Sequence, residues 1–326
     1  MISYVFRSLM QGLVVIAAVG LIAFSLFTFV GDPIASLAGQ EATDADRAEL
    51  RERLGLNDPF PIQFARFMAN AVQGDFGISY RQGRPVADLL AERLPATMEL
   101  ALLSAVLALV AGVGLGIHAA INRRGVVANA VMTLSLVGVS LPTFLIGIGL
   151  IYVFAVELRW LPSFGRGEVT RIGWWTTGLL TPSGRRSLVM PVLTLGFFQL
   201  TLIMRLVRAE MLETLRTEYV RFARARGIPE SSIRFRHALR NTMMPVVTIA
   251  GLQFGSVIAF AIVTETVFQW PGLGSLFVNA VQFVDIPVMA AYLMFVAFVF
   301  VTVNVVTDLI YVVIDPRMRG GMERRR

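Results

Sequence analysis

Leu100–Asn122 reads LALLSAVLALVAGVGLGIHAAIN, and apolar stretches of this kind decide the fold. The stretch contains no Asp, Glu, Lys or Arg over its whole length. A helix of about 20 largely apolar residues crosses the roughly 30 Å hydrocarbon core of a bilayer. Leu100–Asn122 therefore predicts a transmembrane helix.

Five further runs of the same character occur along the chain. They are Ser8–Gly31, Gly125–Val156, Ser187–Met204, Asn241–Thr264 and Ile286–Thr307, and the last is expected to continue past Asp308 to Ile314. The first run also resembles a signal peptide, but it is long enough to span the membrane and lacks a small-residue cleavage site. The sequence thus predicts an all-α membrane protein with six transmembrane helices, the first of which is retained.

The composition supports a membrane protein and excludes several classes of enzyme. Hydrophobic residues make up 56% of the 326 residues and charged residues only 16%, which leaves too little polar surface to cover a soluble globule. There is no cysteine, and two histidines cannot by themselves complete a usual zinc site. All 29 basic residues are arginine, so a GxxxxGK[ST] phosphate-binding loop, which needs a lysine, is excluded. We expect no catalytic residue, metal site or bound cofactor in this chain, and any ATP chemistry must come from a partner.

Arginines beside the apolar runs predict the orientation, because segments on the cytoplasmic side carry an excess of positive charge. With the N-terminus inside, the cytoplasmic segments are residues 1–7, the turn at 123–124, the stretch 205–240 and the C-terminal tail, which together hold 17 of the 29 arginines. Two outer loops disagree with the rule: residues 157–187 hold five arginines and residues 32–95 hold seven. Long loops are largely exempt from the rule, so the conflict is real for 157–187. The charges thus predict cytoplasmic N- and C-termini.

The chain is predicted to divide into three parts. Residues 1–95 combine the first transmembrane helix with a folded extracytoplasmic insert, in which helices are predicted at Asp44–Leu54 and Ile62–Val72. Residues 96–316 form the membrane core. Residues 317–326 form a cytoplasmic tail, whose arginines are expected to lie near anionic lipid headgroups.

The arginine-rich stretch 205–240 predicts a helix–turn–helix on the cytoplasmic side. Apolar residues recur at three- and four-residue steps from Leu212 to Ala223, which places them on one face of a helix. Gly227 suits the left-handed residue after a helix C-terminus, and Pro229 suits the first position of a new helix.

Two interpretations of this stretch stay open on its residues alone. An amphipathic helix lying on the membrane would extend its arginines to lipid phosphates. Such a helix has no need of a sharp Gly-x-Pro reversal, however, and Phe222, Ile228, Ile233 and Phe235 are expected to project at the turn as an apolar knuckle. A knuckle of this kind fits a groove on a soluble partner, so docking is favoured over lipid contact.

The same stretch resembles the coupling loop of the permease subunits of binding-protein-dependent ABC importers, a motif often written EAA-x3-G. The resemblance is strongest to the branch that imports dipeptides, oligopeptides and nickel. It rests on Tyr219-Val220-Arg221-x-Ala223-Arg224-Ala225-x-Gly227, His237-Ala238-Leu239-Arg240-Asn241, Glu265-Thr-Val-Phe268 and Pro271-Gly272-Leu273-Gly274. Arg221 and Phe222 replace the glutamate and first alanine of the general motif. The similarity covers nearly the whole chain.

The resemblance implies a permease of the type I fold that moves peptides, a peptide-like solute or nickel across the cytoplasmic membrane by alternating access. It also implies several partners: a second homologous permease, two ATP-binding cassette ATPase subunits that hold ATP and Mg, an extracytoplasmic solute-binding protein and membrane lipid, but no nucleic acid. The residues expected to couple this chain to the ATPases are Tyr219, Arg221, Phe222, Ala223, Arg224, Ala225, Gly227, Ile228, Pro229, His237 and Arg240. Arg221, Arg224 and Arg226 are expected to pair with acidic groups on the ATPase.

Glu265 and Asp308 are interpreted as the only acidic residues close to or inside the apolar runs, and such a group in a membrane is a functional candidate. Both are expected near a membrane face, where pairing with an arginine or a helix terminus is favoured. The main alternative function, an ion-coupled secondary transporter working without an ATPase, would need a carboxylate near the middle of the membrane. A membrane enzyme would need a cluster of catalytic side chains, and a structural scaffold has no use for the Gly-x-Pro reversal.

Overall fold

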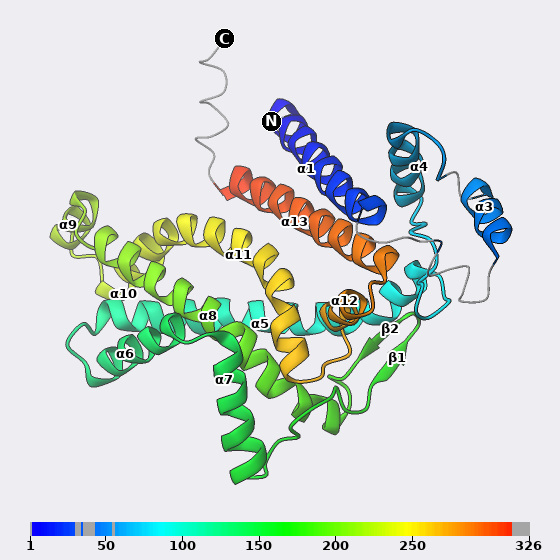
Figure 1. The fold of residues 1–326 in the computed structure, drawn as a ribbon. Helices are drawn as coiled ribbons and strands as arrows, with labels where there is room; N and C mark the ends of the chain where they lie inside the picture. Colours follow the sequence, from blue (N-terminus) through cyan, green and yellow to red (C-terminus); the bar gives the residue numbers. More distant parts are fainter. Residues whose placement is uncertain (1, 30–33, 35–42, 54–55, 315–326) are drawn as a thin grey trace.

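The computed structural model describes residues 2–29, 34, 43–53 and 56–314, which form a mostly helical molecule with one short β-hairpin (Figure 1). The predicted C-terminal tail, 317–326, lies outside the described residues. In chain order the elements are α1 (Ile2–Phe29), α3 (Asp44–Arg53), α4 (Phe60–Val72), α5 (Val86–Ile121), α6 (Val126–Ser140), α7 (Thr143–Leu150), η1 (Ile151–Glu157), β1 (Thr170–Ile172), β2 (Trp175–Thr177), α8 (Pro182–Thr214), α9 (Glu218–Ala225), α10 (Glu230–Ser232), η2 (Ile233–Ala238), α11 (Leu239–Val267), α12 (Leu273–Gln282) and α13 (Ile286–Ile314).

Within the described residues, three helices are individually long and apolar enough to cross a membrane, and up to five spans result if each bent pair of helices counts as one. The single helices are Val86–Ile121, Pro182–Thr214 and Ile286–Thr307. The bent pairs are Val126–Ser140 with Thr143–Glu157, at 114°, and Glu230–Gly251 with Gln253–Val267, at 41°. The first bend falls at Pro142, because proline removes a backbone donor and clashes with the preceding turn. The prediction of a helical membrane protein is therefore confirmed.

The helix α5 begins at Val86, well before the apolar run that predicted it. Asp88, Glu92 and Arg93 interrupt the hydropathy of its first turns, although Leu89 and Leu90 are buried against α12 and α13. Pro95, where the insert was expected to end, lies inside this helix. The extra turns matter because they carry α5 out to the loops at one end of the molecule.

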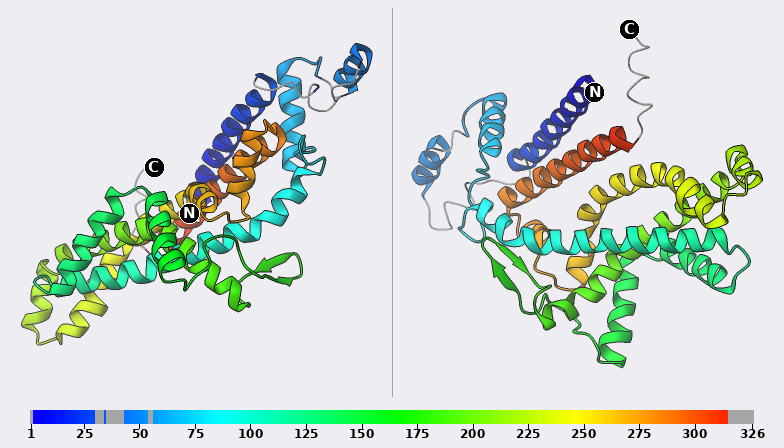
Figure 2. Two further views of the ribbon diagram at one scale, coloured as in Figure 1. Left: turned by 60° about the horizontal axis from the view of Figure 1, so that its bottom comes forward. Right: turned by 180° about the vertical axis from the view of Figure 1, so that it is seen from behind.

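The helices α5 and α8 form the most extensive pair in the fold, and α11 packs against both of them. Gly112 and Gly116 lie where α5 meets α8, and a Cβ atom on Gly116 would come within 2.7 Å of the Met204 carbonyl oxygen. Small residues of this kind let two helix backbones approach closely inside a membrane. On the other side of α11, α13 packs against α1, as the view from behind shows (Figure 2, right).

In the described part of the insert after α1, helices occur at both predicted places. The helices α3 and α4 lie close to the predicted ranges, although α4 begins at Phe60 and not at Ile62. Phe24 of α1 packs against three aromatic rings of α4, Phe60, Phe64 and Phe67, with centroids 5.1–5.7 Å apart. This aromatic contact holds the insert against the first helix.

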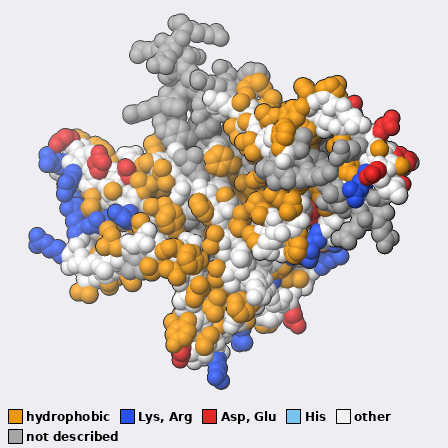
Figure 3. All heavy atoms as spheres, viewed as in Figure 1, with side chains coloured by type: hydrophobic (Ala, Val, Ile, Leu, Met, Phe, Trp, Pro, Cys, Tyr) orange, Lys and Arg blue, Asp and Glu red, His pale blue; other side chains and the backbone are white. Residues whose placement is uncertain are grey.

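The two ends of the molecule differ in structure. The helices α9 and α10 lie at one end, and α12, the start of α5 and the β1–β2 hairpin lie towards the other (Figure 1). The strands pair antiparallel, with Arg171 opposite Thr176, and the sequence did not predict them. Basic side chains gather at the α9 end, and hydrophobic side chains cover much of the surface between the ends (Figure 3).

Candidate functional site

Residues Glu218–Ala238 form a compact helical reversal made of α9, a tight turn, α10 and η2. The chain enters it from α8, which continues beyond its apolar part and ends at Thr214. The hydroxyl of Thr217 then donates to the carbonyl of Thr214 at 2.6 Å, and a new helix begins at Glu218. The expectation that the apolar spacing from Leu212 to Ala223 reflects one continuous helix was therefore wrong.

Gly227 makes the turn possible. Its φ angle is +74°, in the left-handed region that side chains with a Cβ atom disfavour. The N–H of Gly227 donates to the Arg224 carbonyl at 2.9 Å, and the N–H of Ile228 donates to the Ala223 carbonyl at 3.2 Å. Pro229 precedes the first residue of α10 and does not occupy it, one position from the prediction. No heavy atom lies within 4 Å of a Cβ built on Gly227, so backbone conformation alone requires glycine here.

A small apolar cluster joins the two arms of the reversal. Val220 and Ile233 are fully buried, Ala223 is nearly so, and Leu215 and Ile228 pack against them. The predicted knuckle of four projecting apolar residues was therefore wrong for Ile228 and Ile233, which face inward. Because these side chains fill the space between the arms, the reversal has its own core.

The outer face of the reversal presents aromatic and basic side chains. Phe222 is 64% exposed and Phe235 57% exposed, so these two members of the predicted knuckle do project. Arg221 forms an ion pair with Glu218 at 2.7 Å, and Arg224 forms one with Glu230 at 2.7 Å. Both pairs are exposed, so each contributes little to stability. In this chain alone, these arginines thus have partners inside the reversal.

The remaining predicted coupling residues lie on the same reversal and the helix that follows it. Ala225 is exposed at the end of α9, and Tyr219 accepts a hydrogen bond on its hydroxyl from the Asn241 side chain at 2.8 Å. His237 is half-buried in η2, and Arg240 is exposed in the first turn of α11. The structure therefore brings the predicted residues together in one feature at one end of the molecule.

Comparison with known proteins identifies the family. Residues 112–320 match the model of one family, the "binding-protein-dependent transport system inner membrane component". Residues 1–101 match the model of the N-terminal part of such membrane components. The chain belongs to this family.

Curated relatives of this permease family align along nearly the whole chain. A probable peptide ABC transporter permease of Sinorhizobium fredii is 38% identical and covers 97% of this chain and 99% of its own length. A dipeptide transport system permease of Alkalihalophilus pseudofirmus is 35% identical over 98% of this chain and 100% of its own length. A glutathione transport system permease of Escherichia coli is 39% identical over 98% and 99%. The chain is thus a multi-pass inner-membrane transport subunit and not an enzyme.

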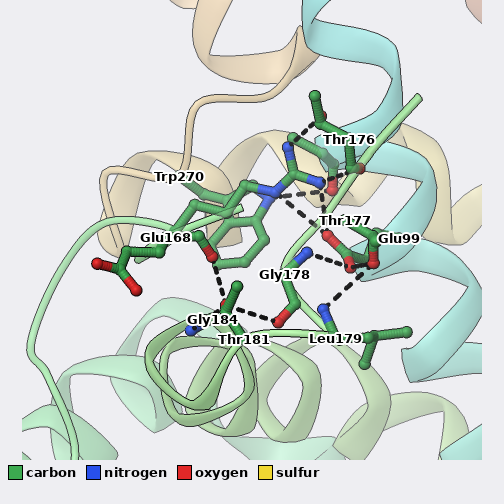
Figure 4. A network of polar contacts seen from close by, with 11 residues as sticks. Glu99, Glu168, Thr176, Thr177, Gly178, Leu179, Thr181, Gly184 and Trp270 are labelled. Carbon is green, nitrogen blue, oxygen red and sulfur yellow. Dashed lines mark hydrogen bonds and ion pairs between the residues drawn. The ribbon is translucent and has the colours of Figure 1, made fainter. Parts of the chain in front are cut away.

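A second group of polar residues in this permease, at the opposite end from the reversal, was missed in the sequence (Figure 4). Glu99 and Arg166 form an ion pair at 2.6 Å with side chains only 3% and 7% exposed. Glu99 also accepts the Thr177 hydroxyl at 2.7 Å and the Gly178 N–H at 2.9 Å. Arg166 was counted only among the outer-loop arginines that disagree with the charge rule. The sequence did contain one signal for this group, because Glu99 is an acidic residue that directly precedes the apolar run at Leu100.

Two further acidic residues anchor the segment between α11 and α13. Glu265 is fully buried and accepts the Thr97 hydroxyl at 2.6 Å and the Ser275 N–H, in the first turn of α12, at 2.9 Å. Asp285, also buried, accepts hydrogen bonds from the loop before α5. The interpretation of Glu265 and Asp308 as the only acidic residues near the apolar runs was therefore wrong. The side chain of Asp308 lies outside those that the structure describes.

Proposed function

We propose that this chain is one of two permease subunits of an ATP-driven importer for peptides or a peptide-like solute. The names of three relatives, for peptide, dipeptide and glutathione transport, support that solute class. In this proposal the chain has six transmembrane helices and cytoplasmic termini, and it moves solute by alternating access. Two separate ATPase subunits hold ATP and Mg, and an extracytoplasmic binding protein delivers the solute.

The helical reversal is the observation that carries the proposed link to the ATPases. Its core is closed by Val220, Ala223 and Ile233, while Phe222 and Phe235 project from its outer face. Exposed aromatic side chains on a rigid support are typical anchors of protein interfaces. A helix lying flat on lipid would turn its apolar residues to one side only, whereas this feature buries some of them within itself.

Reconstitution of the assembled importer with a Gly227→Pro variant tests this assignment. Proline cannot adopt the φ of +74° and removes the N–H that donates to Arg224. We expect ATP hydrolysis and solute uptake to become uncoupled while the membrane helices still insert. Gly227→Asn is the matched control, because asparagine tolerates the left-handed conformation best after glycine, and it should retain most of the coupling.

The same reconstitution decides between the importer and an ion-coupled transporter. Uptake of dipeptide, oligopeptide, glutathione or nickel should require the ATPases, the second permease and ATP. Uptake by this chain alone in liposomes, driven by a proton or sodium gradient, would refute the proposal. Normal coupling in Gly227→Pro would refute the role of the reversal but leave the importer assignment intact.

A further inference from the structure

A small polar pocket lies between the loop before α5, the helix α12 and the start of α13. Its volume is about 130 Å³, and its polar lining includes Arg81, Gln82, Arg93, Asn279 and Asp285. Small-molecule sites usually enclose about 300–1,000 Å³. The pocket therefore suits a single polar group better than a whole peptide.

Asp285 fixes the shape of this pocket. Its carboxylate accepts hydrogen bonds from the hydroxyl of Ser79, from the Tyr80 N–H at 3.1 Å and from the Arg81 N–H at 3.4 Å. Asp285 is 2% exposed, so its oxygens are directed to these donors and not to solvent. The contacts tie the loop to the start of α13 and so position Arg81 at the mouth of the pocket.

Two guanidinium groups line the pocket, against the single carboxylate of Asp285. The guanidinium carbon of Arg81 lies 3.3 Å from the centroid of the Phe283 ring, which keeps this side chain folded over the pocket. Arg93 is half-buried on α5 and interacts electrostatically with the buried carboxylate of Glu265. Among the residues that the structure describes, neither guanidinium has a hydrogen-bond acceptor or an ion pair within 4.0 Å. The lining thus holds two guanidinium groups but one carboxylate, that of Asp285, whose oxygens already accept from Ser79, Tyr80 and Arg81.

Exposed apolar side chains lie in the segment between α12 and α13, next in sequence to the lining residues Ala280 and Asp285. Val281 is 46% exposed, and Phe283 and Val284 are each 49% exposed. Val284 also has a φ of 54°, which a β-branched residue rarely adopts and which proteins tend to retain at functional sites. Arginine and aromatic side chains within an apolar rim are the usual composition of a binding hot spot.

We propose that this pocket receives the carboxylate of an acidic side chain on the extracytoplasmic solute-binding protein. The proposal rests on the proposed function, which places this end of the molecule outside the membrane and supplies that partner. A carboxylate accepts two parallel hydrogen bonds from a guanidinium, so one Asp or Glu side chain satisfies the charge that the pocket presents. The Phe283 ring, which lies against the Arg81 guanidinium, then shields one side of the ion pair from water.

The test uses the complete importer in nanodiscs and titrates the solute-loaded binding protein while ATP hydrolysis is measured. Arg81→Gln and Arg93→Gln should each raise the half-maximal concentration of binding protein about tenfold, and saturating binding protein should restore the rate. Arg84→Gln is the matched control. Arg84 lies on the same loop but forms an exposed pair with Glu92, so its substitution should change that concentration less than about twofold.

A series of Asp→Asn and Glu→Gln variants of the binding protein identifies the carboxylate. One of them should weaken stimulation of the wild-type importer but cause no further loss with Arg93→Gln. The inference is overturned if no acidic variant shows this coupling, or if the arginine variants change only the concentration of solute required. It is also overturned if their effect disappears in nanodiscs without anionic lipid, which would assign the pocket to a lipid headgroup. A wild-type importer that does not respond to binding protein would instead refute the proposed function.

Discussion

Replacing Glu99 by glutamine tests whether the buried ion pair holds the β1–β2 segment against α5. One carboxylate oxygen of Glu99 accepts two N–H groups from Arg166, at 2.6 and 3.2 Å, and the other accepts from Thr177 and Gly178. Glu99 is the acceptor in all four hydrogen bonds. A glutamine side chain replaces one acceptor by an NH₂ group, so a donor must then face a donor whichever way the amide points.

The free-energy cost of Glu99→Gln follows from the burial of the Glu99–Arg166 pair. Arg166 would keep its charge in a site that holds only neutral acceptors, among them the Thr176 hydroxyl and carbonyl. Leaving one buried charge without its partner costs about 3–5 kcal/mol. This cost weakens the attachment of the hairpin segment to α5 and not the whole fold, because the pair joins one loop to one helix. Opening of the hairpin segment should therefore become about 100-fold more frequent or greater, since 1.4 kcal/mol corresponds to a factor of ten.

Trypsin cleavage after Arg171 in the β1 strand measures this opening. Glu99→Gln should raise the cleavage rate by about two orders of magnitude, because cleavage follows the population of the opened segment. Glu92→Gln is the control, since it breaks only the exposed pair with Arg84 and should cost less than about 1 kcal/mol. Arg166→Met combined with Glu99→Gln should cost clearly less than the sum of the single variants. Additive costs, or an unchanged cleavage rate in Glu99→Gln, would refute the role assigned to the pair.

Three other substitutions address separate parts of the structure. Gly116→Val should lower the stability of the detergent-solubilised chain by about 1–3 kcal/mol by separating α5 from α8, measured by thermal unfolding, whereas Gly114→Val should not, because nothing lies within 4 Å of its Cβ position. Gly272→Ala should cost a similar ~1–3 kcal/mol in the same assay, since the added methyl group collides with the Glu265 carboxylate; an unchanged unfolding temperature would contradict the close approach. Phe222→Ser should leave thermal unfolding unchanged but weaken ATPase binding roughly tenfold or more in a titration, and equal binding would exclude Phe222 as an anchor.

Much of the architecture could be predicted because apolar length and turn chemistry are local signals. The runs at Leu100–Asn122 and Ile286–Thr307 correspond to parts of α5 and α13. The Gly-x-Pro sequence identified the reversal at Gly227 because a left-handed residue after a helix is most often glycine. Sequence also indicated that Phe222 is exposed.

The features that could not be predicted depend on contacts between distant segments. Glu99 and Arg166 are far apart in sequence, and neither belongs to a motif that predicts an ion pair. Each β-strand has three residues, too few to show an alternating pattern. Ile233 has the same apolar character as Phe235, and only the angle between the arms of the reversal decides that one is buried and the other exposed. The break after Thr214 lies between two threonines, which are weak helix formers and suit an N-cap, but the apolar spacing continues across it and favours one helix.

In the proposed importer, the self-contained core of the helical reversal has a consequence for docking onto the ATPases. Because Val220, Ala223 and Ile233 already pack together in this chain alone, docking requires little additional ordering of its backbone. A surface that is ordered before association loses less conformational entropy on binding. The strength of the contact then depends on the few side chains that project, and each can be altered without unfolding the support. Such a contact can form and dissociate repeatedly while the same surface is kept intact for the next encounter.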